Sequence, residues 1–127
     1  MTAPESTILL VEDNEVNRDM LVRRLQRAGY RVATAGDGEA ALIAMREQQP
    51  AVVLMDMNLP IKDGWTACRE AQQDASIAVI PIIALTAHAM EEDKHRALEA
   101  GCSDYATKPV DFPDLLTKIA AQFDARH

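Results

Sequence analysis

Aromatic side chains are scarce in this sequence, which has one Trp, two Tyr and two Phe among 127 residues. A hydrophobic core must therefore consist mainly of Ile, Leu, Val, Ala and Met, and the hydrophobic fraction of 48% is high enough to supply one. A chain of this length buries about two-thirds of its extended surface when it folds as one domain. We expect a single domain over residues 1–127, with its core at about residues 6–124.

The sequence also lacks a cluster of Lys and Arg, an apolar run of about 20 residues and a secretory signal. With a formal net charge of −7 and no basic patch to neutralise phosphates, direct binding to nucleic acid is not expected. No membrane attachment is expected either, and the predicted location is the cytoplasm. Cysteine is limited to Cys68 and Cys102 without a CxxC spacing, which in a cytosolic protein predicts two free thiols.

Short aliphatic runs alternate with longer stretches of helical period along the whole chain, which is typical of a parallel α/β sheet. The middle runs are almost continuously apolar, as strands covered by helices on both faces should be. The predicted strands are Ile8–Val11, Arg31–Ala35, Val52–Met55, Ile80–Leu85 and Asp104–Ala106.

Five helices are predicted between and after these strands. The first buries a stripe of Val16, Met20, Leu21, Leu25 and Ala28 and ends at Gly29. The second begins after an N-cap at Asp37 and ends before Pro50. The others cover Gly64–Gln73, about Met90–Ala100, and a stretch from about Asp111 that buries Leu115, Leu116, Ile119 and Phe123.

This alternation predicts a single-domain, doubly wound (βα)5 sandwich of the flavodoxin-like kind, with a parallel five-stranded sheet in the order 2-1-3-4-5. Ligands of such sheets bind beyond the carboxyl ends of the strands where the strand order reverses, here between the first and third strands. Polar residues follow or end four strands and are expected to meet at that edge: Glu12, Asp13, Asp56, Thr86 and Lys108.

Three carboxylates beside one lysine leave a negative site that calls for a cation. Oxygen ligands without a nearby His or Cys favour Mg²⁺, with Mn²⁺ as a substitute. With the metal bound, Asp56 can act as a nucleophile toward phosphorus while Thr86 and Lys108 stabilise the phosphoryl oxygens.

Four strings of the sequence together resemble the receiver domain of two-component response regulators: VEDN at Val11–Asn14, LMDMNLP at Leu54–Pro60, IIALTA at Ile82–Ala87 and KP at Lys108–Pro109. The resemblance covers essentially the whole chain. It implies that Asp56 is the phosphoacceptor, and that Mg²⁺ is held by Asp13, by Asp56, by the main-chain carbonyl of Asn58 and, through water, by Glu12. Thr86 and Lys108 would hold the phosphoryl oxygens, beside a cis Lys108–Pro109 bond.

The resemblance also implies a switch, in which Thr86 moves toward the phosphoryl group and the ring of Tyr105 takes the space it leaves. The face formed by the fourth helix, fifth strand and fifth helix would then change shape for a protein target. Asn58 and His88 occupy positions that influence how long the phosphorylated state lasts. The phosphodonor would be a histidine kinase or a histidine phosphotransfer protein, and the domain a monomer or a phosphorylation-dependent dimer. It would not be an enzyme, although it assists its own phosphorylation and dephosphorylation.

Several alternatives remain at this point. The chain is interpreted as a stand-alone response regulator, which its initial Met favours, or as the receiver of a hybrid sensor histidine kinase, which VEDNEVNR resembles. A phosphatase with an aspartate nucleophile would carry a second Asp two residues after the first, but Asn58 stands there. A nucleotide or flavin binder would need a Gly-rich first loop, whereas this loop is Glu-Asp-Asn-Glu.

Overall fold

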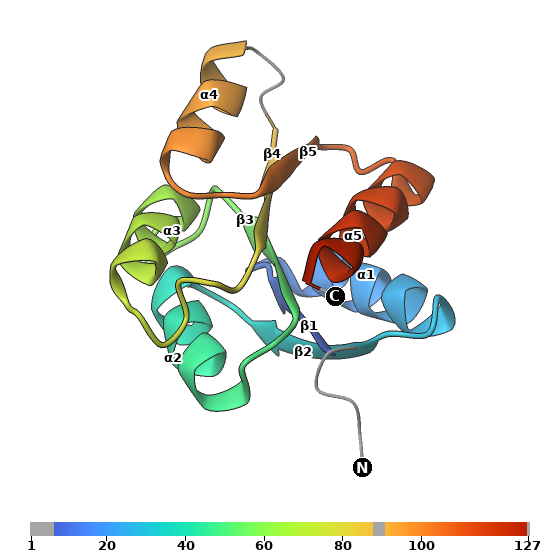
Figure 1. The fold of residues 1–127 in the computed structure, drawn as a ribbon. Coiled ribbons are helices and arrows are strands. Elements are labelled where there is room, and N and C mark those ends of the chain that lie inside the picture. The colour runs from blue at the N-terminus through green and yellow to red at the C-terminus, as the bar shows by residue number, and fades with distance from the viewer. Residues whose placement is uncertain (1–6, 88–90, 127) are drawn as a thin grey trace.

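A computed structural model describes residues 7–87 and 91–126, with the side chains of 91–94 and 124–126 left undescribed. Strands and helices alternate along it (Figure 1). The elements are β1 (Thr7–Val11), α1 (Glu15–Arg27), β2 (Arg31–Ala35), α2 (Gly38–Gln48), β3 (Val52–Asp56), α3 (Gly64–Gln73), β4 (Ile82–Thr86), α4 (Glu91–Glu99), β5 (Asp104–Thr107) and α5 (Phe112–Arg126). None of the helices in this part of the chain combines the length and the apolar character needed to cross a membrane.

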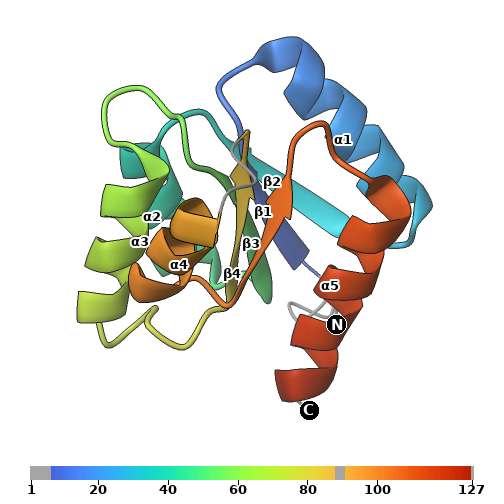
Figure 2. The same cartoon turned by 90° about the horizontal axis from the view of Figure 1, so that it is seen from above.

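The five strands pair in parallel in the order β2-β1-β3-β4-β5, which confirms the predicted doubly wound fold. Helices cover both faces of the sheet: α1 and α5 lie on one side, and α2, α3 and α4 on the other (Figures 1 and 2). Each face has its own hydrophobic core. One core joins the sheet to Leu25 and Ile119, and the other joins it to Met45 and Cys68.

Four helices begin at side-chain caps within the described residues, including α5, where the carboxylate of Asp111 accepts from the Asp114 N–H at 3.2 Å. The carboxylate of Asp37 accepts a hydrogen bond from the Ala40 N–H at 2.8 Å, which confirms the predicted N-cap of α2. Asn14 caps α1 and Asp63 caps α3 in the same way. A cap of this kind contributes about 0.5–2 kcal/mol to helix stability.

The predicted buried stripe of α1 is partly wrong. Leu21 and Leu25 are buried, but Val16 is 76% exposed and Met20 is 48% exposed. A step of five residues turns a helix by about 140° beyond a full turn, so Val16 and Leu21 cannot share one face. Ala28 is also exposed, because α1 ends at Arg27, one residue before it.

Strand β4 starts at Ile82 rather than at the predicted Ile80. Pro81 has no N–H to donate to a neighbouring strand, and the N–H of Ile80 donates instead to the carbonyl of Ile77 in a turn. The predicted free thiols are confirmed. Cys68 and Cys102 are both buried and form no disulfide, and their Sγ atoms share a hydrogen bond at 3.2 Å.

Candidate functional site

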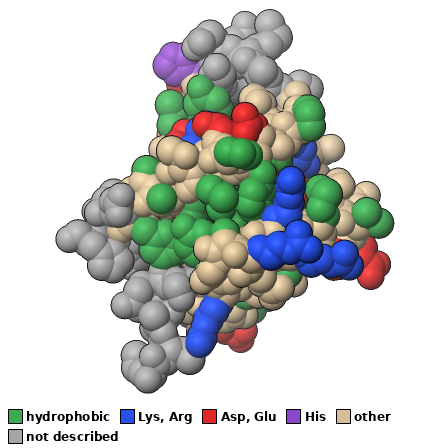
Figure 3. Space-filling model, turned by 90° about the vertical axis from the view of Figure 1, so that its right-hand side faces the viewer, with side chains coloured by type: hydrophobic (Ala, Val, Ile, Leu, Met, Phe, Trp, Pro, Cys, Tyr) green, Lys and Arg blue, Asp and Glu red, His purple; other side chains and the backbone are tan. Residues whose placement is uncertain are grey.

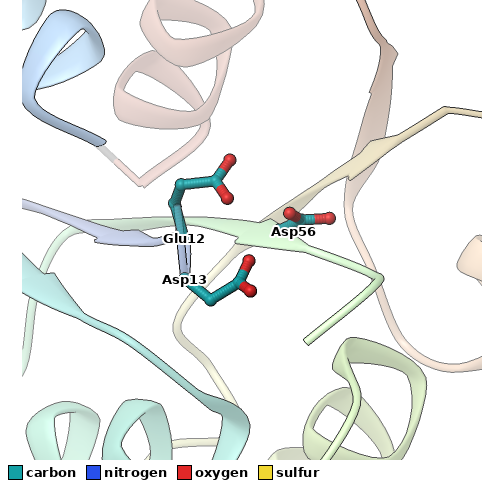
Figure 4. Close-up of side chains that lie close together, drawn as sticks. All are labelled: Glu12, Asp13 and Asp56. Atoms are coloured by element: carbon teal, nitrogen blue, oxygen red, sulfur yellow. The ribbon is translucent and has the colours of Figure 1, made fainter. Parts of the chain in front are cut away.

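Three carboxylates meet at the carboxyl edge of the sheet. Glu12 and Asp13 directly follow β1, and Asp56 is the last residue of β3. Because β1 and β3 pair with Val11 opposite Met55, the two strand ends lie side by side. Figure 4 shows the three side chains converging, and ligand oxygens of all three lie within 4.8 Å of one another. Glu12 and Asp56 are buried, at 2% and 3% exposure, whereas Asp13 is exposed.

Lys108 supplies the positive charge beside these carboxylates. Its Nζ donates to Asp56 Oδ2 at 2.7 Å and lies 3.5 Å from Glu12 Oε1. The lysine follows β5, and its main-chain N–H donates to the carbonyl of Thr86 at 2.8 Å. The peptide bond that follows, Lys108–Pro109, is cis. One cation is thus shared between the two buried carboxylates.

Main-chain N–H groups bind the other oxygen of each buried carboxylate. Asp56 Oδ1 accepts from the N–H of Asn58 at 3.0 Å, and Glu12 Oε2 accepts from the N–H of Asn14 at 3.1 Å. These bonds fix the orientation of both carboxylates within short turns after their strands. The site is therefore ordered by the backbone as well as by the charge of Lys108.

Burial raises the pKa of Glu12, and the negative charge of Asp56 acts in the same direction. The Asn14 N–H and the charge of Lys108 oppose this rise without cancelling it. For Lys108, burial is the largest single influence and lowers the pKa, but the hydrogen bond and charge of Asp56, together with Glu12, outweigh it. The net pKa of Lys108 is raised, so the lysine stays protonated and keeps its ion pair.

The carboxylates open into a cleft of about 530 Å³. Six of the residues singled out by sequence line it: Glu12, Asp13, Asp56, Asn58, Thr86 and Lys108. Trp65 and Arg96 also line the cleft, and sequence reasoning did not include them in the site. His88 lies outside the described residues. Three carboxylates, a threonine and a lysine are thus brought to one edge of the sheet, a set of groups that can offer oxygen ligands to a hard cation and hydrogen-bond donors to an anion.

Tyr105 lies on β5, outside the lining of this cleft. In the pairing of β4 with β5, Thr86 lies opposite Thr107 and Ala84 opposite Tyr105. Residues two apart along a strand point to the same face of a sheet, so Thr86 and Tyr105 share a face. Lys118 of α5 donates to the Tyr105 carbonyl at 2.7 Å, and its Nζ lies 5.2 Å from the centre of the Tyr105 ring.

Comparisons with a family model, with curated proteins and with solved structures all point to the same family. The family model of the response regulator receiver domain matches residues 8–120. The polar-differentiation response regulator DivK of Brucella anthropi is 34% identical over 113 residues, which cover 89% of this chain and 92% of DivK. The chain spans about half or less of longer curated relatives that it also matches, 47% of one and 25% of another.

Solved structures agree with this match. The receiver domain of the sensor histidine kinase PA1611 from Pseudomonas aeruginosa, solved with a magnesium ion in its active-site cleft, matches with a TM-score of 0.86 and 38% identity. That match covers 93% of this chain and 97% of the other. A co-crystal structure of the Saccharomyces cerevisiae phosphotransfer protein Ypd1 with the receiver domain of Ssk1 matches with a TM-score of 0.86, 31% identity and coverages of 94% and 90%.

Proposed function

The chain belongs to the response regulator receiver domain family, and on that premise we propose that Asp56 is its phosphoacceptor. The observation that carries the proposal is the position of Asp56 at the end of β3, where it is buried yet lines an open cleft. Its carboxylate lies beside two other carboxylates and 2.7 Å from the Lys108 ammonium. A buried acid with a fixed cationic partner at a cleft is a candidate for chemistry rather than for packing.

In the proposed reaction, a carboxylate oxygen of Asp56 attacks the phosphorus of the donor and forms an acyl phosphate. The bond between phosphorus and the donor atom breaks, and the donor takes the electron pair of that bond. Lys108 and Thr86 donate to the phosphoryl oxygens, on which negative charge gathers. Asp56 is thus a substrate residue, and the residues around it assist both its phosphorylation and its dephosphorylation.

We propose that Mg²⁺, or Mn²⁺ in its place, binds in the acidic cluster. Asp13, Asp56 and the main-chain carbonyl of Asn58 would hold the ion directly, and Glu12 would hold it through water. The fit rests on the donors present, since three carboxylates supply oxygen atoms within 4.8 Å of one another. Bound there, the ion would neutralise charge on the phosphoryl oxygens during transfer.

Thr86 and Tyr105 are proposed to form the switch. They share a face of adjacent strands, so a displacement of the Thr86 side chain toward the phosphoryl group would free space on the Tyr105 side. The response would reach the surface formed by α4, β5 and α5, where a protein target binds. Asn58 borders the phosphoacceptor and, with His88, is proposed to set the lifetime of the phosphorylated state.

The phosphodonor is proposed to be a histidine kinase or a histidine phosphotransfer protein, the kinds of partner with which receiver domains interact. The exposed side of α1 supports this proposal. A groove of about 480 Å³ beside the site is lined by Met20, Leu21, Pro109 and Val110, among others. Figure 3 shows hydrophobic side chains gathered on the side of the molecule where α1 and α5 lie, with basic side chains next to them. Such a surface suits a helical partner that presents its phosphohistidine to the cleft.

Two settings for the domain have support. The match to nearly the full length of DivK favours a single-domain response regulator. The match to the receiver domain of PA1611 favours a receiver within a hybrid sensor histidine kinase. The chemistry proposed for Asp56 is the same in both settings.

The phosphoacceptor is tested with Mg²⁺ and acetyl phosphate, followed by intact-mass measurement. We expect the wild type to gain the mass of one phosphoryl group and Asp56→Asn to gain none, because the amide is a poor nucleophile. Asp56→Asn also removes the ion pair between Asp56 and Lys108. Far-UV circular dichroism therefore serves as the control that the variant is folded. Equal labelling of the two proteins would contradict the assignment.

The switch is tested with Thr86→Ala. This variant is expected to accept the phosphoryl group on Asp56. It is expected to lose the phosphorylation-dependent NMR shifts around Tyr105, because it lacks the Thr86 hydroxyl that is proposed to respond to the phosphoryl group. Shifts equal to those of the wild type would show that Thr86 does not transmit the signal.

A further inference from the structure

A second cation stands at the rim of the phosphorylation cleft. Arg96 of α4 and Trp65 of α3 both line it, together with Asp56 and Lys108. The guanidinium carbon of Arg96 lies 4.4 Å from the centre of the Trp65 ring system, which is the geometry of a cation–π contact. Trp65 is only 8% exposed, whereas Arg96 is exposed. The indole therefore forms a fixed surface on which the arginine rests.

The position of Trp65 is set by the phosphoacceptor strand itself. The preceding residue, Gly64, is so close to β3 that a Cβ atom there would meet the carbonyl oxygen of Asp56 at 2.5 Å. Its N–H donates to the carbonyl of Met57 at 3.2 Å. The first turn of α3 is thus fixed against the end of β3, and the indole has a definite place relative to Asp56.

The charge of Arg96 is not used elsewhere in the described part of the chain. No carboxylate of the described residues lies within ion-pair distance of its guanidinium. Lys108, in contrast, is already shared by Asp56 and Glu12. An anion that enters the cleft would thus meet one cation that is occupied by carboxylates and one whose only described partner is an aromatic ring.

Arg96 changes the net charge of the cleft. Among the described residues that line the cleft, three carboxylates and two cations leave one formal negative charge. A bound divalent cation would change this to one positive charge, and without Arg96 the metal-loaded cleft would be neutral. A phosphodonor carries about two negative charges at neutral pH, so Arg96 decides whether the loaded cleft attracts it.

We propose that Arg96, held on the face of Trp65, is a second phosphoryl-recognition residue of this site. It draws the anionic phosphodonor into the cleft and pairs with the phosphoryl group once that group is on Asp56. The planar guanidinium suits this role because two of its N–H groups can donate to two phosphoryl oxygens at once. The inference rests on the proposed function of Asp56. Because Arg96 belongs to α4, the new pair also ties α4 to the phosphorylated state.

The first experiment measures the rate of Asp56 phosphorylation by acetyl phosphate with Mg²⁺ at low and high salt. Arg96→Gln is expected to slow the reaction about threefold to tenfold at low salt, the range of a partly exposed charge-assisted interaction. The loss should shrink at high salt, because salt screens exposed charges. Arg96→Lys keeps the positive charge but lacks the paired N–H donors of the guanidinium. Its phosphorylation rate is expected to lie between those of Arg96→Gln and the wild type.

Arg31→Gln is the matched control. Arg31 is also an exposed arginine, but it begins β2 at the opposite end of the sheet, so its loss changes the net charge equally without changing the cleft. Its phosphorylation rate is expected to equal that of the wild type. An equal loss in Arg31→Gln and Arg96→Gln, or a loss in Arg96→Gln that high salt does not reduce, would overturn the proposal.

The second experiment does not depend on turnover. Trp65 is the single tryptophan of the chain, so the fluorescence reports the surroundings of this one indole, and comparison with Arg96→Gln isolates the part that depends on Arg96. Beryllofluoride, a phosphoryl mimic, added with Mg²⁺ is expected to change the emission of the wild type as the Arg96 guanidinium shifts on the indole to pair with the mimic, and to change that of Arg96→Gln much less. Identical responses in the two proteins would overturn the inference. Asp56→Asn separates the two proposals, because labelling of that variant would refute the phosphoacceptor itself.

Discussion

Replacement of Gly64 by Ala should damage the proposed phosphorylation site, although Gly64 has no side chain that could take part in the reaction. A Cβ at residue 64 would lie 2.5 Å from the carbonyl oxygen of Asp56 and 2.7 Å from the Cα of Met57. Both atoms belong to the backbone, so neither can rotate away as a side chain can. The first turn of α3 must therefore move away from β3, or the end of β3 must bend.

The expected cost follows from this geometry. Overpacking of a closely fitted interior costs about 1–3 kcal/mol, and the higher helix propensity of Ala returns at most about 1 kcal/mol. We expect the free energy of unfolding to fall by about 2 kcal/mol, which for a domain of this size lowers Tm by roughly 8 °C. Urea denaturation followed by far-UV circular dichroism measures the first quantity, and thermal denaturation the second.

The same displacement should slow phosphorylation, because the backbone that bends carries Asp56, the proposed phosphoacceptor. A misplacement of reacting groups by a fraction of an ångström to one ångström lowers rates by roughly tenfold or more, and acetyl phosphate with intact-mass detection gives that rate. Gly36→Ala is the control, since a Cβ there would meet only the Arg18 Nη1 atom at 3.8 Å, and its stability should stay within about 0.5 kcal/mol. A Gly64→Ala protein as stable and as reactive as Gly36→Ala would refute the reasoning.

Two further predictions concern the core and the surface. Leu25→Ala should lower the free energy of unfolding by about 2–5 kcal/mol in urea denaturation, because Leu25 is fully buried. Val16→Ala on the exposed side of the same helix should change it by less than about 0.5 kcal/mol. The second prediction concerns Asp74, whose pKa is lowered from 3.8 to about 2 by hydrogen bonds from the Ser76 hydroxyl, the Arg46 guanidinium and the Ser76 N–H. The contribution of Asp74 to stability is thus present above pH 3.8 and is lost as the pH falls toward 2. Carboxyl NMR titration of Ser76→Ala, which removes the hydroxyl but keeps the main-chain N–H, should show the pKa of Asp74 rising toward 3.8. An unchanged pKa would exclude the Ser76 hydroxyl as a cause.

The fold and the acidic cluster were predictable because both follow from strand order. Once five strands alternate with helices, the residues that follow the strands must meet at one edge of a parallel sheet. Glu12 and Asp56 are 44 residues apart in the sequence, yet they share a lysine in the structure. The prediction needed only the position of each residue relative to a strand end, which the apolar runs mark well.

The rotation of α1 about its own axis and the residues at the rim of the cleft were harder to predict. The side of α1 that faces the sheet depends on a few tens of degrees of helix rotation, and spacings of three to five residues are too loose to define it. This is why the spacing predicts that Val16 and Met20 are buried, although Val16 is 76% and Met20 48% exposed. Arg96 gave no signal, because a single arginine on a polar helix resembles any solvated side chain until the structure places α4 beside Trp65.

The hydrogen bonds of Asp56 indicate how little this residue and Lys108 must rearrange for the proposed phosphoryl transfer. Asp56 Oδ1 is held by the N–H of Asn58 and Oδ2 by Lys108, so the proposed nucleophile is oriented before any donor arrives. When a phosphoryl group binds an oxygen of Asp56, the Lys108 ammonium can exchange that carboxylate oxygen for a neighbouring phosphoryl oxygen without leaving the cleft. Lys108 also contacts Glu12 at 3.5 Å, which keeps the ammonium near the site during the exchange. Because the proposed reaction replaces partners of an existing cation, Lys108 contributes charge that is already in place before the donor binds.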